Sequence, residues 1–219
     1  MLKTTDLLDL SKTIAAELFD GCEYPWQVLG NIKSFILKLG ENLPSDRFEK
    51  RGDDIWVAKS AKILPSAYIA GPCIIDEDAE IRHCAFIRGS AIVGKNCVVG
   101  NSVELKNVIL FDNVQTPHYN YVGDSILGYK AHMGAGSVTS NVKSDRTLVA
   151  VREGDEKLET GLKKFGAILG DYVEIGCNSV LNPGSVIGRN SNVYPLSSVR
   201  GTVPPNSIYK NADDIVTKY

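Results

Sequence analysis

Apolar residues recur along most of the chain at intervals of six, after a first stretch with helical spacing. Within residues 1–50 the apolar positions form two runs with helical spacing, as on one side of a helix. They are Leu7, Leu10, Ile14, Leu18, Val28, Leu29, Ile32, Phe35, Ile36 and Leu39. We therefore predict an N-terminal helical segment over residues 1–50, which caps one end of the repeat array that follows.

The six-residue series begins at Val57. Its members are Val57, Ile63, Ile69, Ile75, Ile81, Ile87, Val93, Val99, Leu105 and Phe111. Four residues after each of the first nine stands a small or apolar residue, from Ala61 to Ile109. This period fits neither a helix nor a simple strand, and it is typical of a coil with three short strands per turn. We predict an all-β fold, a left-handed parallel β-helix over residues 51–210, with about six coils stacked at about 4.8 Å.

The series is interrupted first at Gln115 and resumes at Tyr121. We interpret this break as an insertion of four residues after Phe111, which places His118 in a corner loop. Loops of this kind often carry function.

The second interruption is an inserted loop at residues 142–166, before the series resumes at Leu169. The residues on either side of Gly154 alternate in the way typical of short strands, which predicts a hairpin arm. Residues 211–219 lie beyond the repeats, and we predict a C-terminal tail there.

Composition and charge limit the partners and the cellular compartment that we expect for the protein. The net charge of −2 gives no bulk electrostatic reason to expect nucleic acid or an anionic membrane as a partner. No apolar run approaches the roughly 18 residues that span a bilayer, and the first ten residues lack the basic start of a signal peptide. Five cysteines without a CxxC pair are typical of free thiols, so we expect a cytoplasmic protein.

Arg88 and Lys106 are 18 residues apart, so they should stack on adjacent coils about 5 Å from each other. In this spacing Ala70 lies below them and Gly128 above, so nothing in their column compensates the two like charges. One interpretation is a binding site for a phosphate, for which Gly128 leaves room. The other is a pair of solvated surface charges.

The chain has three histidines, His83, His118 and His132. Their separations of 35 and 14 residues do not resemble a metal-ligand cluster, so we predict no metal site. His83 is best explained as a surface residue.

Two blocks of sequence resemble a known enzyme domain. One runs from Gly100-Asn101 through Glu104 and Lys106 to Pro117-His118 and Tyr121-Val122-Gly123-Asp124, and the other is residues 134–141. Over residues 70–210 the chain resembles the acetyltransferase domain of bifunctional N-acetylglucosamine-1-phosphate uridylyltransferases. The nucleotidyltransferase half of those enzymes has no counterpart here, although the sequence around Tyr24 resembles a linker of sugar nucleotidyltransferases.

The resemblance implies a set of roles. His118 is similar to the catalytic base and Glu104 to the carboxylate near it. The positions that correspond to sugar-phosphate contacts are Arg88, Lys106, Tyr121, His132, Asn141 and Lys164. The positions that correspond to contacts with the acetyl-CoA co-substrate are Ala135, Cys177 and Pro195. His132 stands where the family has asparagine, and Cys177 and Pro195 replace small residues.

The resemblance thus implies a homotrimeric acyltransferase that moves an acetyl group from coenzyme A to a hexosamine 1-phosphate. His118 suits a general base, because histidine titrates near neutral pH. The alternative is a non-catalytic protein that binds a sugar phosphate or nucleotide sugar and derives from a sugar nucleotidyltransferase. Binding of coenzyme A separates these two hypotheses.

Overall fold

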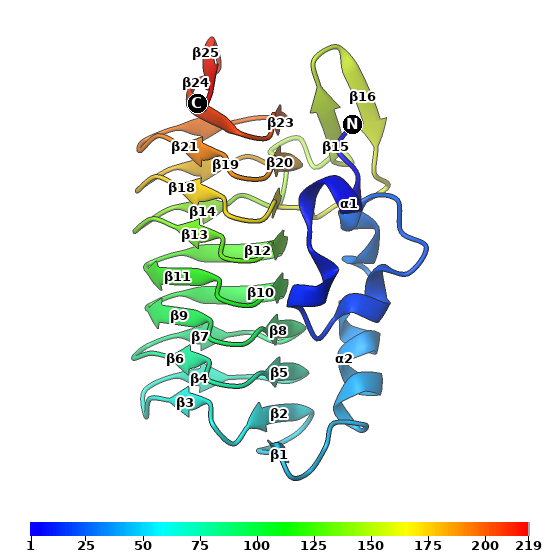
Figure 1. The fold of residues 1–219 in the computed structure, drawn as a ribbon, viewed down its shortest axis with the longest axis vertical. Helices are drawn as coiled ribbons and strands as arrows, with labels where there is room; N and C mark the ends of the chain where they lie inside the picture. Colours follow the sequence, from blue (N-terminus) through cyan, green and yellow to red (C-terminus); the bar gives the residue numbers. More distant parts are fainter. Residues whose placement is uncertain (219) are drawn as a thin grey trace.

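The computed structural model describes residues 1–218, in which a parallel β-helix has short helices along one side (Figure 1). The chain coils in the left-handed sense, and each coil contributes short strands to three faces. Positive backbone φ angles recur at the corners, every six residues at Asp78, Cys84, Ser90, Asn96 and Ser102. The predicted fold class, an all-β left-handed parallel β-helix with an N-terminal helical segment, is confirmed.

Each face is a row of parallel strands, and we name the faces by their surroundings. The covered face consists of β2 (Ile55–Ala58), β5 (Cys73–Ile75), β8 (Ala91–Val93), the second halves of β10 (Glu104–Leu110) and β12 (Tyr121–Leu127), β17 (Ala167–Leu169), β20 (Ser185–Ile187) and β23 (Thr202–Val203). The side face consists of β3 (Lys62–Ile63), β6 (Glu80–Ile81), β9 (Val98–Asn101), β11 (Gln115–His118), β13 (His132–Met133), β18 (Glu174–Ile175), β21 (Asn192–Val193) and β24 (Ser207–Asn211). The open face consists of β4 (Tyr68–Ile69), β7 (Phe86–Ile87), the first halves of β10 and β12, β14 (Val138–Thr139), β19 (Val180–Leu181) and β22 (Ser198–Val199).

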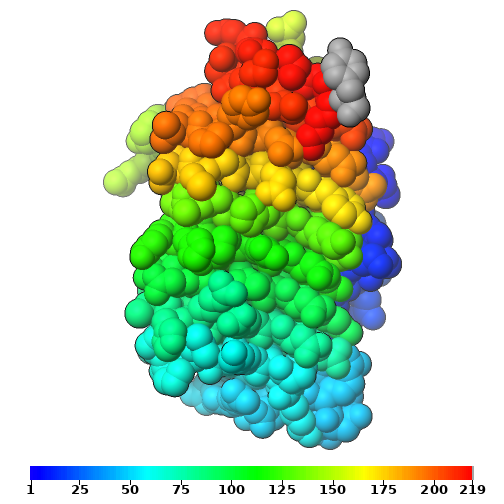
Figure 2. Space-filling view, turned by 60° about the vertical axis from the view of Figure 1, so that its left-hand side comes forward, coloured from blue at the N-terminus to red at the C-terminus, as the bar shows by residue number. Residues whose placement is uncertain are grey.

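The N-terminal helices lie along the covered face rather than over an end of the array (Figure 1). They are α1 (Thr4–Leu7), η1 (Leu10–Lys12), η2 (Ala16–Phe19), η3 (Pro25–Val28) and α2 (Ile32–Gly40). In Figure 2 the coils form successive bands of colour, and this segment is seen only along one edge. The predicted end cap is therefore wrong in its position. The end of the first coil is instead extended by β1 (Phe48–Lys50), which pairs antiparallel with β2.

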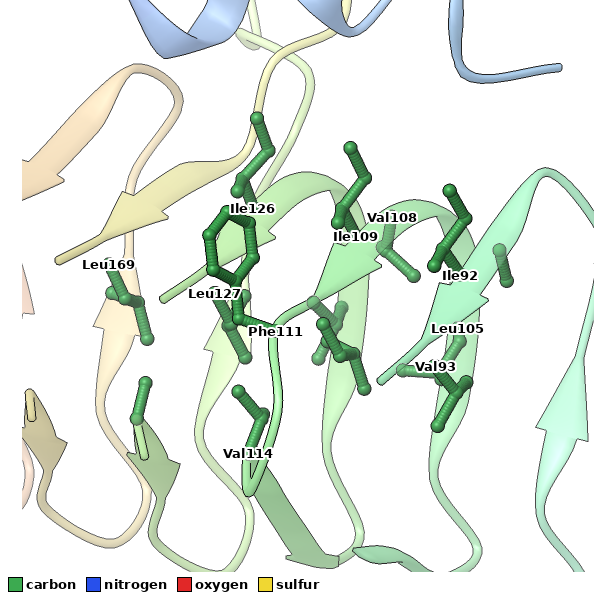
Figure 3. Packing of buried hydrophobic residues seen from close by; sticks show 14 of the residues in the cluster. Ile92, Val93, Leu105, Val108, Ile109, Phe111, Val114, Ile126, Leu127 and Leu169 are labelled. Atoms are coloured by element: carbon green, nitrogen blue, oxygen red, sulfur yellow. The ribbon is translucent and has the colours of Figure 1, made fainter. Parts of the chain in front are cut away.

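Two layers of apolar side chains explain this position. On the covered face Ile92, Ile109 and Ile126 point out of the prism toward the helices, whereas Val93 and Leu127 point into it (Figure 3). All five are completely buried. Burial of an isoleucine side chain contributes about 1.5–3 kcal/mol, so the outward row holds the N-terminal segment in place.

The register corrects the first predicted break. Val93 pairs with Leu110 and Leu110 with Leu127, so each of these two coils is one residue shorter than 18. The strands β10 and β12 run through the corner as seven-residue strands, which removes one residue from each coil. There is no four-residue insertion after Phe111, and His118 lies in β11, paired with Asn101.

The second predicted break is a hairpin arm, as expected. It consists of β15 (Ala150–Glu153) and β16 (Glu156–Glu159), which pair antiparallel beside the last coils (Figure 1). The array ends in an antiparallel pair between β24 and β25 (Asp214–Thr217), within the predicted tail at residues 211–219. Tyr219 lies outside the described residues.

All five cysteines are free thiols, in agreement with the sequence-based prediction. Within residues 1–218 the helices are too short or too polar to cross a bilayer.

Candidate active site

The open face is bounded by two corners that carry the candidate residues. Arg88 and Lys106 occupy adjacent coils at the corner shared with the covered face, where the amide of Arg88 donates to the carbonyl of Leu105 at 2.8 Å. His118 occupies the corner shared with the side face. Tyr121 lies between the two corners, three residues after His118 and directly beside Glu104 of the coil below.

The corner of His118 continues upward as a regular column. The amide of Gly136 donates to the carbonyl of His118, that of Asn178 to Ala135, and that of Leu196 to Cys177, at 2.9–3.0 Å. His118, Ala135, Cys177 and Pro195 therefore stand on successive coils, separated by about 4.8 Å per step. The three predicted contacts with acetyl-CoA thus share one edge with the candidate base.

His118 is an exposed side chain on a well-fixed backbone. Its amide donates to the side chain of Asn120 at 3.2 Å. The coil below packs so closely that a Cβ atom on Gly100 would lie 1.6 Å from the carbonyl oxygen of Pro117. Only glycine allows this approach, and the backbone that carries His118 is held at the corner as a result.

The opposite corner is organised by Asp124, whose side chain is only 5% exposed. Its carboxylate accepts from the Nζ of Lys106 at 3.0 and 3.2 Å and from the Nδ2 of Asn107 at 2.9 Å. The side-chain amide of Asn141 also donates to it. These bonds fix Lys106 and Asn141 on one carboxylate.

Tyr121 and Lys164 join this corner through Asn141. The Nδ2 of Asn141 donates to the hydroxyl of Tyr121 at 3.2 Å. Burial raises the pKa of the Tyr121 phenol, and the nearby charge of Asp124 raises it further, so this group remains a neutral donor. The amide of Phe165 donates to the carbonyl of Asn141 at 3.0 Å, which places the exposed Lys164 next in the chain at the same corner.

Glu104 does not have the surroundings that the resemblance implied. Its Oε1 accepts from the Nη1 of Arg88 at 2.7 Å, and this bond raises the pKa of the guanidinium. Within residues 1–218 no hydrogen bond joins Glu104 to His118. In the described chain the carboxylate that the resemblance placed near the base is therefore bonded to Arg88 instead.

The surroundings of the two cations differ from the prediction as well. Arg88 is paired with Glu104 and Lys106 with Asp124, so both charges are compensated. The residue above Lys106 is Gly123 and not Gly128, because the coil is one residue shorter than 18 and lacks the predicted four-residue insertion. A Cβ atom on Gly123 would lie 2.4 Å from the hydroxyl of Tyr121, so glycine keeps space at this position.

His132 lies apart from the other candidate residues. It belongs to β13 of the side face, and its Nδ1 is 2.7 Å from Glu174. A single chain therefore does not bring His132 to the open face. In the part of the chain that the structure describes, no three side chains of the metal-ligating types converge.

Three residues of this corner were not singled out by sequence reasoning. Asp124 and Asn107 are 17 residues apart. Coils of 18 residues would not place these two positions on top of each other, so the sequence did not predict their contact. Trp26 of the N-terminal segment stacks on Phe165 with ring centroids 5.9 Å apart, and Asn107 donates to the carbonyl of Leu29 at 3.1 Å. The aspartate within the Gly123-Asp124 pair was the one available signal, because a buried carboxylate requires partners.

Comparisons with known proteins show what the chain as a whole is similar to. The chain is 31% identical to the "Bifunctional protein GlmU" of Methanococcus maripaludis over 97% of its own length and 53% of that relative. It is 30% identical to a "Bifunctional sugar-1-phosphate nucleotidylyltransferase/acetyltransferase" of Sulfurisphaera tokodaii, over 65% of the chain and 40% of the relative. The chain thus spans about half the length, or less, of these curated relatives.

Among solved structures, a hexapeptide transferase family protein from Anaplasma phagocytophilum matches with a TM-score of 0.42 and 16% identity, over 74% of this chain and 78% of that one. A family model described as the GMPPB C-terminal domain matches residues 69–186, the part that carries both corners of the open face. Since this match covers more than half of the chain, the protein belongs to the GMPPB C-terminal domain family.

Proposed function

We propose that the protein is a coenzyme A-dependent N-acetyltransferase that acts on a hexosamine 1-phosphate. The observation that carries the proposal is the arrangement of the open face. A column of small and exposed residues rises from His118 at one corner, and two cations stand at the other corner, with Tyr121 between them. The word acetyltransferase in the name of one relative supports the same reaction.

The acceptor sugar is proposed to lie across Tyr121, with its phosphate at Arg88 and Lys106. Glu104 is 34% exposed and can turn away, so the phosphate replaces it as the partner of Arg88. Lys106 and Asn141 are held by the buried Asp124, and they present their remaining donors with little loss of side-chain entropy. Lys164, at the same corner, adds a third cation.

The donor is proposed to lie along Ala135, Cys177 and Pro195, with its thioester at the level of His118. His118 removes a proton from the substrate amine, and the nitrogen then attacks the thioester carbonyl. The C–S bond breaks as the amide forms, the leaving sulfur takes the proton that His118 holds, and coenzyme A leaves as its thiol. Backbone N–H groups are suited to hold the oxyanion that forms in between.

We also propose a homotrimer with the active site between neighbouring prisms. Large apolar side chains remain exposed on the open face, with Tyr68 at 65%, Phe86 at 40% and Val180 at 37%. Packing a second chain against this face would bury them. It also allows the His132 of another chain to approach the site, which His132 does not reach within its own chain.

A screen of amino sugar phosphates with acetyl-coenzyme A, read out by release of the free thiol, tests the reaction. We expect glucosamine 1-phosphate or a close relative to be acetylated. Arg88→Ala and Lys106→Ala should each weaken sugar-phosphate binding by about 1.5–3 kcal/mol, as for charged hydrogen bonds. Calorimetry with coenzyme A is the control: sugar-phosphate binding without coenzyme A binding or transfer would instead identify a non-catalytic binding protein.

A further inference from the structure

The hairpin arm β15–β16 is seated firmly on the last coils. Val151 of β15 and Val149, which immediately precedes this strand, are completely buried. A Cβ atom on Gly184 would lie 2.8 Å from the carbonyl oxygen of Ala150, and one on Gly201 would lie 3.0 Å from that of Arg152. Both glycines have positive φ angles, and the backbone of β15 rests directly on these two corners. The arm is therefore a fixed wall beside the coils.

A cavity of about 460 Å³ lies between this wall and the coils. The coil side provides Asn182, Pro183, Arg200 and Gly201. The arm and the segment leading to it provide Lys143, Thr147, Leu148, Ala150, Arg152, Lys157 and Glu159. None of these residues is among the candidate active-site residues, so the cavity is a separate feature of the molecule.

The cavity is strongly cationic. Its lining includes Lys143, Arg152, Lys157 and Arg200, and Glu159 is the one carboxylate in that lining within residues 1–218. Lys157 pairs with Glu159, and Lys143 with Asp145 at 3.4 Å. Arg152 and Arg200 have no ion-pair partner among the described residues. Two guanidinium groups are thus available to a ligand.

The register of the hairpin brings like charges together. Arg152 stands directly opposite Lys157 in the antiparallel pair, and Ala150 opposite Glu159, on the side of the arm that lines the cavity. Like charges directly opposite each other destabilise a β-ladder. The nearby cations also lower the pKa of Glu159, first through its bond to Lys157. An anion bound in the cavity would relieve this repulsion.

We propose that this cavity binds an organic diphosphate, such as the diphosphate group of a nucleotide. Arginine presents paired donors that match phosphate oxygens, and Arg152 of the arm and Arg200 of the coils both line the cavity. Two linked phosphates satisfy both guanidinium groups at once, and Lys157, which also lines the cavity, adds a further cation. Asn182 lies on the coil immediately below Arg200, where its amide donates to the carbonyl of Val199, and it closes the floor.

Calorimetric titration of the intact chain with UDP and, in a separate arm, with coenzyme A tests this proposal. Arg152→Gln and Arg200→Gln should each weaken binding of at least one of these ligands about tenfold or more, the size expected for a charged hydrogen bond. The matched control is Arg51→Gln, which removes the same charge at the far end of the array and should leave the affinity unchanged.

A second readout is the melting temperature, which the same ligand should raise in the wild type and much less in the two cavity variants. Tighter binding of UDP or of coenzyme A decides which molecule supplies the diphosphate. Arg88→Gln separates this site from the proposed sugar-phosphate site and should leave diphosphate affinity unchanged. The proposal is overturned if neither ligand binds at millimolar concentration, or if both cavity variants bind UDP and coenzyme A as tightly as the wild type does.

Discussion

The covered face and the open face are built from the same coils, yet their outward residues have opposite surroundings. On the covered face Ile92, Ile109 and Ile126 are completely buried under the N-terminal segment. On the open face Phe86 and Val180, which also point outward, are 40% and 37% exposed. The geometry of the coil therefore determines which side chains point inward, but not what covers those that point outward.

The difference shows where a β-helix can place a site. A face that is covered by its own chain stabilises the fold, but ligands cannot reach it. A face that is left open can carry ligand-binding residues, and its apolar side chains remain available to a second chain. The boundary between the two faces carries Lys106, Asn107 and Asp124. Asn107 bonds to the N-terminal segment on the covered side, whereas Lys106 lies at the edge of the open face.

The largest effect on stability should come from the covered face. Ile109→Ala should lower the free energy of unfolding by about 2–5 kcal/mol, because it removes a completely buried side chain between two rigid layers. Val180→Ala on the open face should change it by only about 0.5 kcal/mol in the single chain. Denaturant unfolding of both variants measures the contrast, and equal losses would mean that the two faces are not different in the way described.

Assembly should depend on the open face. Phe86→Lys places a charge where we propose that another chain packs, and burying an unpaired charge costs several kcal/mol. We expect light scattering to find trimers for the wild type and smaller species for this variant. A wild type that is monomeric at micromolar concentration, or a variant that remains a full trimer, would contradict the proposed interface.

The two cations at the boundary should differ in their effect on stability. Lys106→Ala deprives the buried carboxylate of Asp124 of its cation and should destabilise the fold by about 1–3 kcal/mol. Arg88→Ala breaks a more exposed pair and should cost less than about 1 kcal/mol. Thermal unfolding of the two variants measures this. A larger loss for Arg88→Ala would show that the buried carboxylate is not the centre of this corner.

The smallest effect on stability should come from the ion pairs of Glu77, near the first coils. Glu77 accepts from Arg47 and pairs with Lys95 at 2.7 Å, and these bonds lower its pKa from 4.5 to about 2. Because the folded pKa lies below the unfolded one, this stabilisation is complete above pH 4.5 and is lost as the pH falls toward 2. Glu77→Gln should melt at a lower temperature than the wild type at pH 7, with the gap closing at low pH. A gap that does not depend on pH would assign the effect to packing.

Much of the fold was predictable because the six-residue period specifies an inward side chain at each step. The shorter coils were not predictable, because Phe111 continues the six-residue series and Ile109 the series four residues later. In the structure neither is an inward residue of its coil, since Leu110 is the partner of Val93. They are apolar because the N-terminal segment covers them, with Phe19 packed edge-on against Phe111 at 5.9 Å. A pattern of apolar residues cannot distinguish burial inside the prism from burial under helices.

The candidate site was predictable only in part for the same reason. Arg88 and Lys106 were correctly placed on adjacent coils because no short coil separates them. The partners of the two cations, Glu104 and Asp124, depend on the position of the corner and on side-chain reach, which spacing does not reveal. The role of Trp26 depends on contacts between distant segments, so it needed the structure.

The most direct test of the proposed acetyl transfer is the turnover of His118→Ala at saturating acetyl-coenzyme A and amino sugar phosphate. Removal of a general base should lower the rate by about 10²- to 10⁴-fold. His83→Ala is the matched control, because His83 stands in the same corner column two coils below and bonds to Ser66. We expect that control to turn over like the wild type. If His118→Ala transfers acetyl groups as fast as the wild type does, His118 is not the base and the proposed mechanism is contradicted.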